Sequence, residues 1–152
     1  MDFSVKIEGL DKIERATREM QQSVAAEINK ALFASAKHVE AEAKRSIVSG
    51  QKSGRTYKRR SVTHQASAPG EAPASDTGRL VNTITSYLNT SEGESTVVAG
   101  RGTVKYAAML EFGTRHIAAR PFMFPALEKS KGWIKERLAA AVRKAAAKSV
   151  GK

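Results

Sequence analysis

Few side chains in this sequence have the types and spacing that chemistry requires, and Glu111 and His116 are the best pair. They stand five residues apart across a predicted turn, so general acid–base catalysis between a carboxylate and an imidazole is sterically conceivable. No second carboxylate, serine nucleophile or metal-ligand spacing accompanies them, and His38, His64 and His116 do not form an HxxxH set. The sequence therefore predicts no catalytic residue, no metal site and no cofactor, and we expect that the protein is not an enzyme.

Glu111 has a simpler interpretation. A carboxylate beside a tight turn more often accepts hydrogen bonds from backbone N–H groups or pairs with an arginine such as Arg115 or Arg120. The glycines between residues 50 and 78 lack the strand–helix frame of a phosphate-binding loop. The predicted role of Glu111 is therefore structural.

The second chemical feature of the sequence is its positive charge. The net charge is +11, and residues 43–70 hold seven Lys or Arg side chains and no acid. This asymmetry is typical of contact with nucleic acid or with an acidic protein surface, but a solvated basic face has the same composition. We take four residues of this segment as candidates for partner binding: Arg55, Lys58, Arg59 and Arg60.

Composition sets the class of protein. A chain of 152 residues suits one domain, here taken as residues 1–152. Cysteine is absent, the N-terminus has acids where a signal peptide needs positive charge, and no apolar run approaches the ~20 residues of a membrane span. The sequence predicts a soluble protein with no membrane contact, made and used without export.

The first half of the chain predicts a strand, a long helix and a loop. Phe3 to Ile7 alternates as a short half-buried strand does, and apolar residues then recur at steps near three and four from Asp11 to Val48. At about 1.5 Å per residue this amphipathic helix exceeds 50 Å, so we expect a bend or an intersubunit role. Residues 50–77 are predicted to be a long flexible basic loop, either a mobile arm or an inert linker.

The second half predicts an antiparallel hairpin and a C-terminal helix. Two β-rich runs, Thr83 to Leu88 and Thr96 to Gly100, flank a polar turn, and a helical turn precedes them. Together with the N-terminal strand they predict a small, mostly antiparallel sheet covered by the long helix, which is an α+β fold. The final helix is expected to begin at Pro125 and to run to about Ser149.

Between the hairpin and the final helix lies a dense corner, Tyr106 to Ala126. Its first residues have helical spacing, and Gly113 is placed as a helix C-cap, where positive φ carries no steric cost. Pro121 cannot continue a helix and fixes the approach of Phe122. The corner is therefore predicted to be rigid and structural.

Three blocks of the sequence resemble the HK97 gp10 family of tailed-phage morphogenesis proteins. They are Asp76-Thr77-Gly78-x-Leu80, then Tyr106-Ala107-x-x-x-Glu111-Phe112-Gly113-Thr114, then Arg120-Pro121-Phe122-x-x-Pro125-Ala126. The order of predicted elements agrees with this family, and the resemblance covers nearly the whole chain. It implies a non-enzymatic neck or tail-completion subunit that forms a ring, usually six-fold, at the head–tail junction of a siphovirus-like phage or prophage.

The resemblance gives the residues of the corner a role. It implies a homo-oligomer located in the virion neck or tail, made in the bacterial host cytoplasm, whose basic loop grips head-completion, connector or tail-tube proteins. The residues that we expect to shape the subunit, its core included, and the ring interface are Tyr106, Glu111, Phe112, Gly113, Arg120, Pro121, Phe122 and Pro125. Two alternatives stay open at this stage: a terminator that caps the tail tube, and a nonspecific DNA-binding protein, for which we expect weak contact at most.

Overall fold

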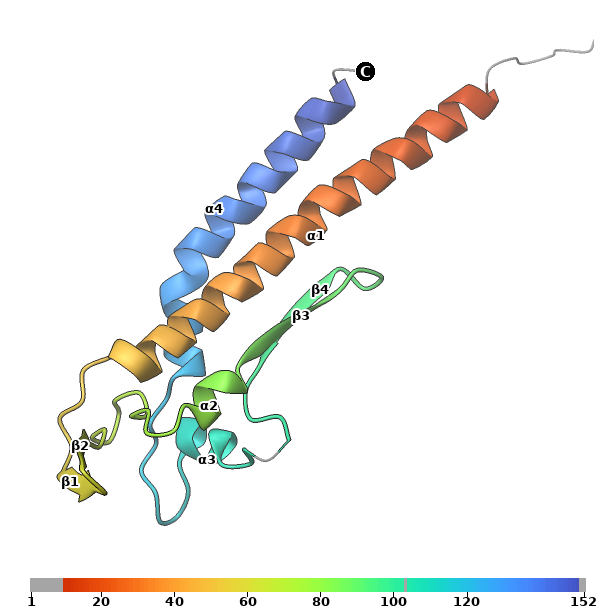
Figure 1. Ribbon diagram of the computed structural model, residues 1–152. Helices are drawn as coiled ribbons and strands as arrows, with labels where there is room; N and C mark the ends of the chain where they lie inside the picture. The colour runs from red at the N-terminus through yellow and green to blue at the C-terminus, as the bar shows by residue number, and fades with distance from the viewer. Residues whose placement is uncertain (1–9, 103, 151–152) are drawn as a thin grey trace, which may run out of the picture.

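Two long antiparallel helices form the body of the molecule. The computed structural model describes residues 10–102 and 104–150, and the predicted strand at Phe3 to Ile7 lies outside them. Helix α1 spans Leu10–Ser49 and helix α4 spans Met123–Val150. Figure 1 shows them side by side, with the smaller elements gathered near the C-terminal half of α1. The predicted helix boundaries are thus confirmed to within about two residues.

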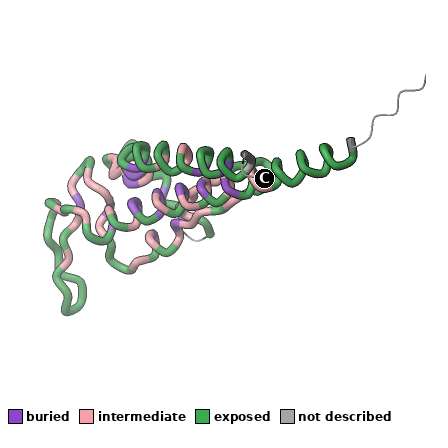
Figure 2. The backbone as a smooth tube through the Cα atoms, turned by 90° about the horizontal axis from the view of Figure 1, so that it is seen from above, coloured by how far each residue is buried: buried purple, intermediate pink, exposed green. Residues whose placement is uncertain are grey.

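Helix α1 is longer than its partner and runs on beyond it. Its 40 residues correspond to roughly 60 Å, against 28 residues for α4. Every residue from 11 to 22 is exposed, and Figure 2 shows this green end of α1 extending past the rest of the molecule. The N-terminal turns of α1 therefore have no covering element among the described residues.

Small residues and ion pairs join α1 to α4. Ala31 of α1 and Ala141 and Ala145 of α4 are buried, which lets the two backbones approach closely. Glu27 of α1 accepts hydrogen bonds and ion pairs from Lys148 at 2.6 Å and from Lys144 at 3.1 Å. These two lysines lower the pKa of Glu27 to about 2, so its carboxylate stays ionised at neutral pH.

The same arrangement recurs near the other end of the helix pair. Lys129 of α4 pairs with Glu42 at 2.9 Å, and this hydrogen bond lowers the pKa of that carboxyl. His38 of α1 stacks on Trp133 of α4, with ring centroids 4.3 Å apart. Charged and aromatic contacts thus fix the register of the two helices along their shared length.

The apolar core lies where the small elements meet the two helices. Val39, Ala43 and Ile47 of α1 form one side of it. The other side is built by six buried residues from the rest of the chain: Leu80, Ile84, Val104, Ala107, Phe122 and Ala126. Phe122 is 1% exposed and is the largest fully buried side chain of the described residues. The corner is therefore tied directly to the core.

The strands form two separate antiparallel hairpins. Strands β3 (Thr85–Asn89) and β4 (Glu94–Val98) pair beside α1, where Ser86 donates a 2.6 Å hydrogen bond to Glu40. Burial raises the pKa of Glu40, but hydrogen bonds from Lys44, Ser86 and Lys37 outweigh it and bring the pKa to about 2. The predicted α+β fold, with the long helix against a small antiparallel sheet, is confirmed.

The second hairpin falls in the segment predicted as a loop. Within residues 50–77, β1 (Thr56–Arg59) pairs with β2 (Val62–Gln65), so this part of the loop has regular structure that the sequence did not predict. The remaining elements are the short helices α2 (Arg79–Asn82) and α3 (Ala107–Phe112). Whether the segment moves as an arm stays a prediction.

Candidate partner-binding surface

Glu111 closes the corner by capping α4. Its carboxylate accepts hydrogen bonds from the backbone N–H groups of Phe122 at 2.8 Å, Met123 at 3.0 Å and Phe124 at 2.8 Å. A helix leaves its first four N–H groups without intrahelical acceptors, and the fourth position here is Pro125, which has no N–H. One carboxylate therefore satisfies every free donor at this helix end, and its charge lies at the positive pole of the helix dipole.

A tight turn between α3 and α4 makes this cap possible. Gly113 ends α3 with φ 74° and ψ 177°, a conformation that favours glycine, and an added Cβ would lie 2.9 Å from the backbone nitrogen of Ala119. The chain then reverses through Thr114 and Ile117, whose N–H and C=O groups bond at 2.8 Å. The predicted C-cap role of Gly113 is confirmed.

Backbone hydrogen bonds hold the segment between the turn and α4 against α3 and the basic loop. The N–H of Arg120 bonds the carbonyl of Leu110 at 2.6 Å, and the N–H of Gly70 bonds that of Ala119 at 2.9 Å. The Arg120 side chain donates to the carbonyl of Ser67 through Nε at 3.3 Å. Pro121, half-buried, follows directly and leads to the core residue Phe122. Arg120 thus fastens the corner to the end of the basic loop.

The outer face of the corner is apolar and exposed. Phe112 is 81% exposed and Phe124 63%, although α3 and α4 are both fixed by the contacts above. Tyr106 and Met109 stand at helical spacing from Phe112 and are also exposed. The expectation that Phe112 shapes the core is therefore wrong, because α3 buries its opposite face, through Ala107. The expectation that it forms an interface is a separate prediction.

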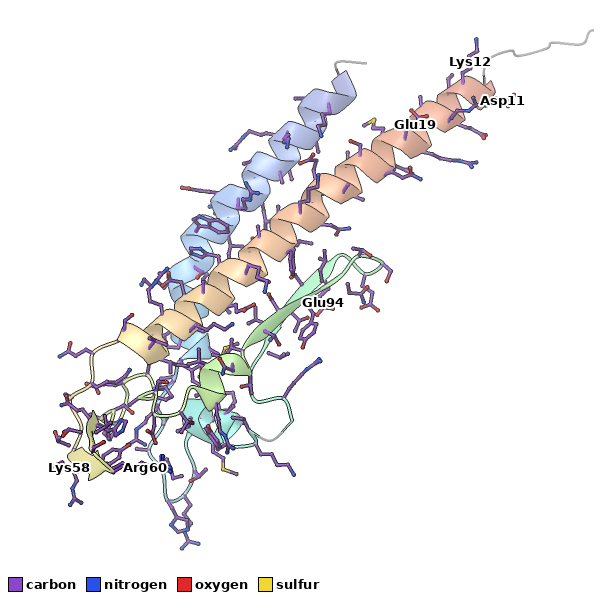
Figure 3. The ribbon with its side chains drawn as sticks, viewed as in Figure 1. Asp11, Lys12, Glu19, Lys58, Arg60 and Glu94 are labelled. Carbon is purple, nitrogen blue, oxygen red and sulfur yellow. The ribbon has the colours of Figure 1, made fainter. Side chains whose placement is uncertain are left out.

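The four candidate residues of the basic loop differ in their surroundings. Arg59 pairs with Asp76, and Nε2 of His64 lies 3.5 Å from the same carboxylate, which ties the hairpin to the segment before α2. Arg55, Lys58 and Arg60 are exposed and have no ion-pair partner among the described residues. Figure 3 shows Lys58 and Arg60 at the hairpin, at the end of the molecule opposite Asp11. Three of the four predicted side chains are therefore available to a partner.

The base of the loop is anchored by polar contacts that the sequence did not reveal. Lys52 Nζ donates to the carbonyls of Ser46 at 3.0 Å and Ala72 at 2.9 Å, and burial lowers its pKa. The carboxylate of Glu71 accepts bonds from the N–H and the hydroxyl of Ser53 at 3.0 and 2.6 Å. The hydrogen bond from the Ser53 hydroxyl lowers the pKa of Glu71. These contacts hold both ends of the loop together, and the hairpin lies between them.

This geometry places Glu111 and His116 in separate hydrogen-bond arrangements. Both carboxylate oxygens accept bonds from backbone donors at the start of α4, and His116 lies in the exposed turn, where its backbone N–H donates to the Thr114 hydroxyl at 3.2 Å. The described residues contain no group of His, Asp or Glu side chains suited to a metal ion. Of the helices in the described part of the chain, none combines the length and apolar character that a bilayer crossing requires.

The molecule combines a rigid corner, an exposed apolar face and a basic hairpin. These features are typical of a structural assembly protein. Comparison with protein families agrees: residues 11–113 match the model described as "Bacteriophage HK97-gp10, putative tail-component". The chain belongs to this HK97 gp10-like family and is a structural component of a phage tail. The match ends at the C-cap of α3 and so covers less than the sequence resemblance did. Comparisons with curated proteins and with solved structures found no match.

Proposed function

We propose that this protein is a ring-forming subunit that completes the tail of a siphovirus-like phage or prophage and joins it to the head. The observation that carries the proposal is the exposure of Phe112, 81%, on a corner whose geometry is fixed by the Glu111 cap. Apolar surface of this kind marks interaction sites on small proteins. The family supplies the phage tail as the setting.

Rigidity of the corner matters because a ring closes only when every subunit repeats the same angle. A ring contact is heterologous: two different faces of the subunit meet, and a small error in angle accumulates around the axis. The carboxylate cap and the positive-φ glycine hold α3 and α4 at one angle. We propose six subunits in the ring. The basic hairpin, through Arg55, Lys58 and Arg60, contacts the adjacent head-completion, connector or tail-tube protein.

Assembly is tested by measuring mass. The chain alone, and the chain mixed with its candidate connector and tail-tube proteins, is examined by mass photometry, with Phe112→Ala and Val142→Ala compared. Val142 is the control because it is also more than half exposed but lies on α4 away from the corner. We expect a ring species that Phe112→Ala weakens and Val142→Ala leaves unchanged. Monomer alone under every condition overturns the proposal.

The assembly step is tested in particles. Electron microscopy of virions made without this protein distinguishes two outcomes. Filled heads beside free tails support a joining role, whereas tails of excess length indicate a terminator that caps the tail tube. Normal particles would mean that neither role belongs to this protein.

The hairpin also supports a second, minor function, contact with DNA. Lys58 and Arg60 are exposed cations without an ion-pair partner among the described residues, and phosphate contacts of this kind release counterions. We expect weak binding of duplex DNA, with an affinity that falls steeply as the salt concentration rises. The double variant Lys58→Ala/Arg60→Ala should abolish this binding. Binding undetectable at about 50 mM salt would leave the hairpin as a protein contact only.

A further inference from the structure

The seam between α1 and α4 continues as an open groove at the free end of α1. Where α4 ends, a cavity of about 510 Å³ lies against α1, lined by Ala16, Glu19 and Met20 and, across from them, by Ala145 and Lys148 of α4. Residues of α1 line one side of this groove along its whole length. On the other side, α4 contributes only Ala145 and Lys148, close to its C-terminal end. The groove is therefore half of a helix–helix contact with nothing seated in its outer half among the described residues.

The exposed face of α1 has the same pattern as the face that α4 covers. Ile13, Met20 and Glu27 follow one another at seven-residue steps, two helical turns each, so they share one side of the helix. Glu27 is buried against α4, whereas Met20 is 48% exposed and Ile13 65%. On the side of α1 that α4 covers, the apolar side chains Ile13 and Met20 thus extend for about two turns past the end of α4, and packing would stabilise this surface.

The opposite end of the molecule has a shape that fits such a groove. The corner presents Phe112 and Phe124 on a fixed backbone, and the hairpin with Lys58 and Arg60 lies at the same end in Figure 3, away from Asp11 and Glu19. Aromatic side chains seated in apolar recesses dominate the energetics of protein interfaces. Neither end reaches the other within one chain, so the two surfaces are open to different copies.

One acid of the groove and one base of the corner are also complementary in charge. Glu19 lines the groove and is an exposed acid with no ion pair among the described residues, whereas the neighbouring Lys148 is already paired with Glu27. At the corner the exposed Arg115 has no ion-pair partner in the described part of the chain. Among the residues that line the groove, the charge without an ion pair is thus the negative charge of Glu19, and at the corner Arg115 offers a positive one.

We propose that the groove of one copy, at Ala16, Glu19 and Met20, receives the α3–α4 corner of a second copy, with Phe112 seated against Met20 and Arg115 beside Glu19. The contact is heterologous, and repeated around an axis it closes a ring. This inference deepens the ring-forming function proposed above and rests on it. It assigns the protruding end of α1 to the neighbouring subunit.

The first test is cross-linking, for which the absence of cysteine gives a clean background. Met20→Cys protein is mixed with Phe112→Cys protein and oxidised, and a second mixture uses Val48→Cys in place of Phe112→Cys. Val48 is the matched control because it is 65% exposed at the C-terminal end of α1. We expect a disulfide-linked dimer from the first mixture only, and a ladder of linked subunits from the Met20→Cys/Phe112→Cys double variant.

The second test reverses the charges. Glu19→Arg should weaken assembly about two- to five-fold, and so should Arg115→Glu, as is usual for exposed ion pairs. The two changes together should restore it, which a merely local effect on folding would not do. Glu128→Arg on the outer face of α4 is the control and should leave assembly unchanged.

Each result decides between the contact and the function on which it rests. Oligomers that form without the Met20–Phe112 cross-link overturn the contact and leave the ring. Met20→Cys cross-linking with itself would mean that two grooves face each other, and Phe112→Cys linking to a tail-tube or connector protein would give the corner a foreign partner. Either finding overturns the contact. The absence of any oligomer, with or without partner proteins, overturns the ring and the contact together.

Discussion

Replacing Glu111 by alanine should loosen the whole C-terminal helix, although the substitution lies outside it. The change removes the acceptor of three backbone hydrogen bonds, to Phe122, Met123 and Phe124, at 2.8–3.0 Å. Water can solvate the N–H of the exposed Phe124, but Phe122 is in the core and its N–H is partly buried. The loss is therefore larger than that of an ordinary surface cap.

The magnitude follows from these contacts. Loss of an N-cap acceptor costs about 0.5–2 kcal/mol, a charge at the helix dipole adds about 0.3–1 kcal/mol, and a partly buried donor left without a partner adds about 1–3 kcal/mol. Since these effects overlap, we expect Glu111→Ala to lower the free energy of unfolding by roughly 2–4 kcal/mol. Glu111→Gln keeps the shape and one acceptor oxygen but loses the charge, so about half of that loss is expected.

The assay is urea unfolding followed by the fluorescence of Trp133, which is the single tryptophan of the chain and lies on α4, stacked on His38. Glu128→Ala is the matched control, since Glu128 is an exposed acid of α4 whose ion pair is with Lys131, and it should cost no more than about 0.5 kcal/mol. If Glu111→Ala is no more destabilising than Glu128→Ala, the carboxylate cap does not hold the corner.

Three further changes test other parts of the structure. Phe122→Ala should cost about 3–5 kcal/mol in urea unfolding because it empties the largest fully buried position. Gly113→Ala should lower the free energy of unfolding by about 1–3 kcal/mol, because alanine is strained at its positive φ. Gly132→Ala in α4 is the control: an added Cβ meets nothing within 4 Å there, so the free energy of unfolding should rise by about 0.5–1 kcal/mol. Equal effects of the two changes would refute the estimate for Gly113. The pKa values of Glu27 and Glu40 are lowered to about 2 from 4.5, so their ionised forms stabilise the fold above that ordinary value and this stability is lost as pH falls towards 2. With both acids replaced by glutamine, the free energy of unfolding should decrease less steeply as the pH is lowered. An unchanged dependence on pH would refute this role of the two carboxylates.

The elements that the sequence predicts best are those whose signal is local. Helix α1 follows from apolar residues at helical steps, and β3–β4 follows from two β-rich runs around a polar turn. Gly113 is identifiable because its requirement is a backbone angle that glycine alone meets readily. In each case neighbouring residues carry enough information to define the element.

The elements that the sequence misses depend on distant partners. The hairpin at Thr56–Gln65 has Tyr57 and Val62 as its large apolar side chains, and it is held instead by Asp76, which pairs with Arg59 from outside the hairpin. Lys148 and Glu27 are 121 positions apart, so their pairing has no local signature. Such contacts follow from the packing of α1 on α4, not from any short stretch of sequence.

The exposure of Phe112 could not be predicted from the sequence either, for a different reason. Helical spacing shows that Tyr106, Met109 and Phe112 lie together, but the side of α3 that meets the core depends on where Leu80 and Phe122 are packed. Since α3 buries Ala107, the large side chains are left outside. An apolar cluster that looks like core in the sequence is thus a surface in the folded subunit.

The cap of α4 joins residues on both sides of the end of the family match at Gly113. Glu111 lies inside residues 11–113, while the three N–H groups that it accepts lie outside them. The same contacts engage both carboxylate oxygens, which gives Glu111 a structural role at the start of α4. The residue that looked most like a catalyst is therefore the one that fixes the angle between α3 and α4.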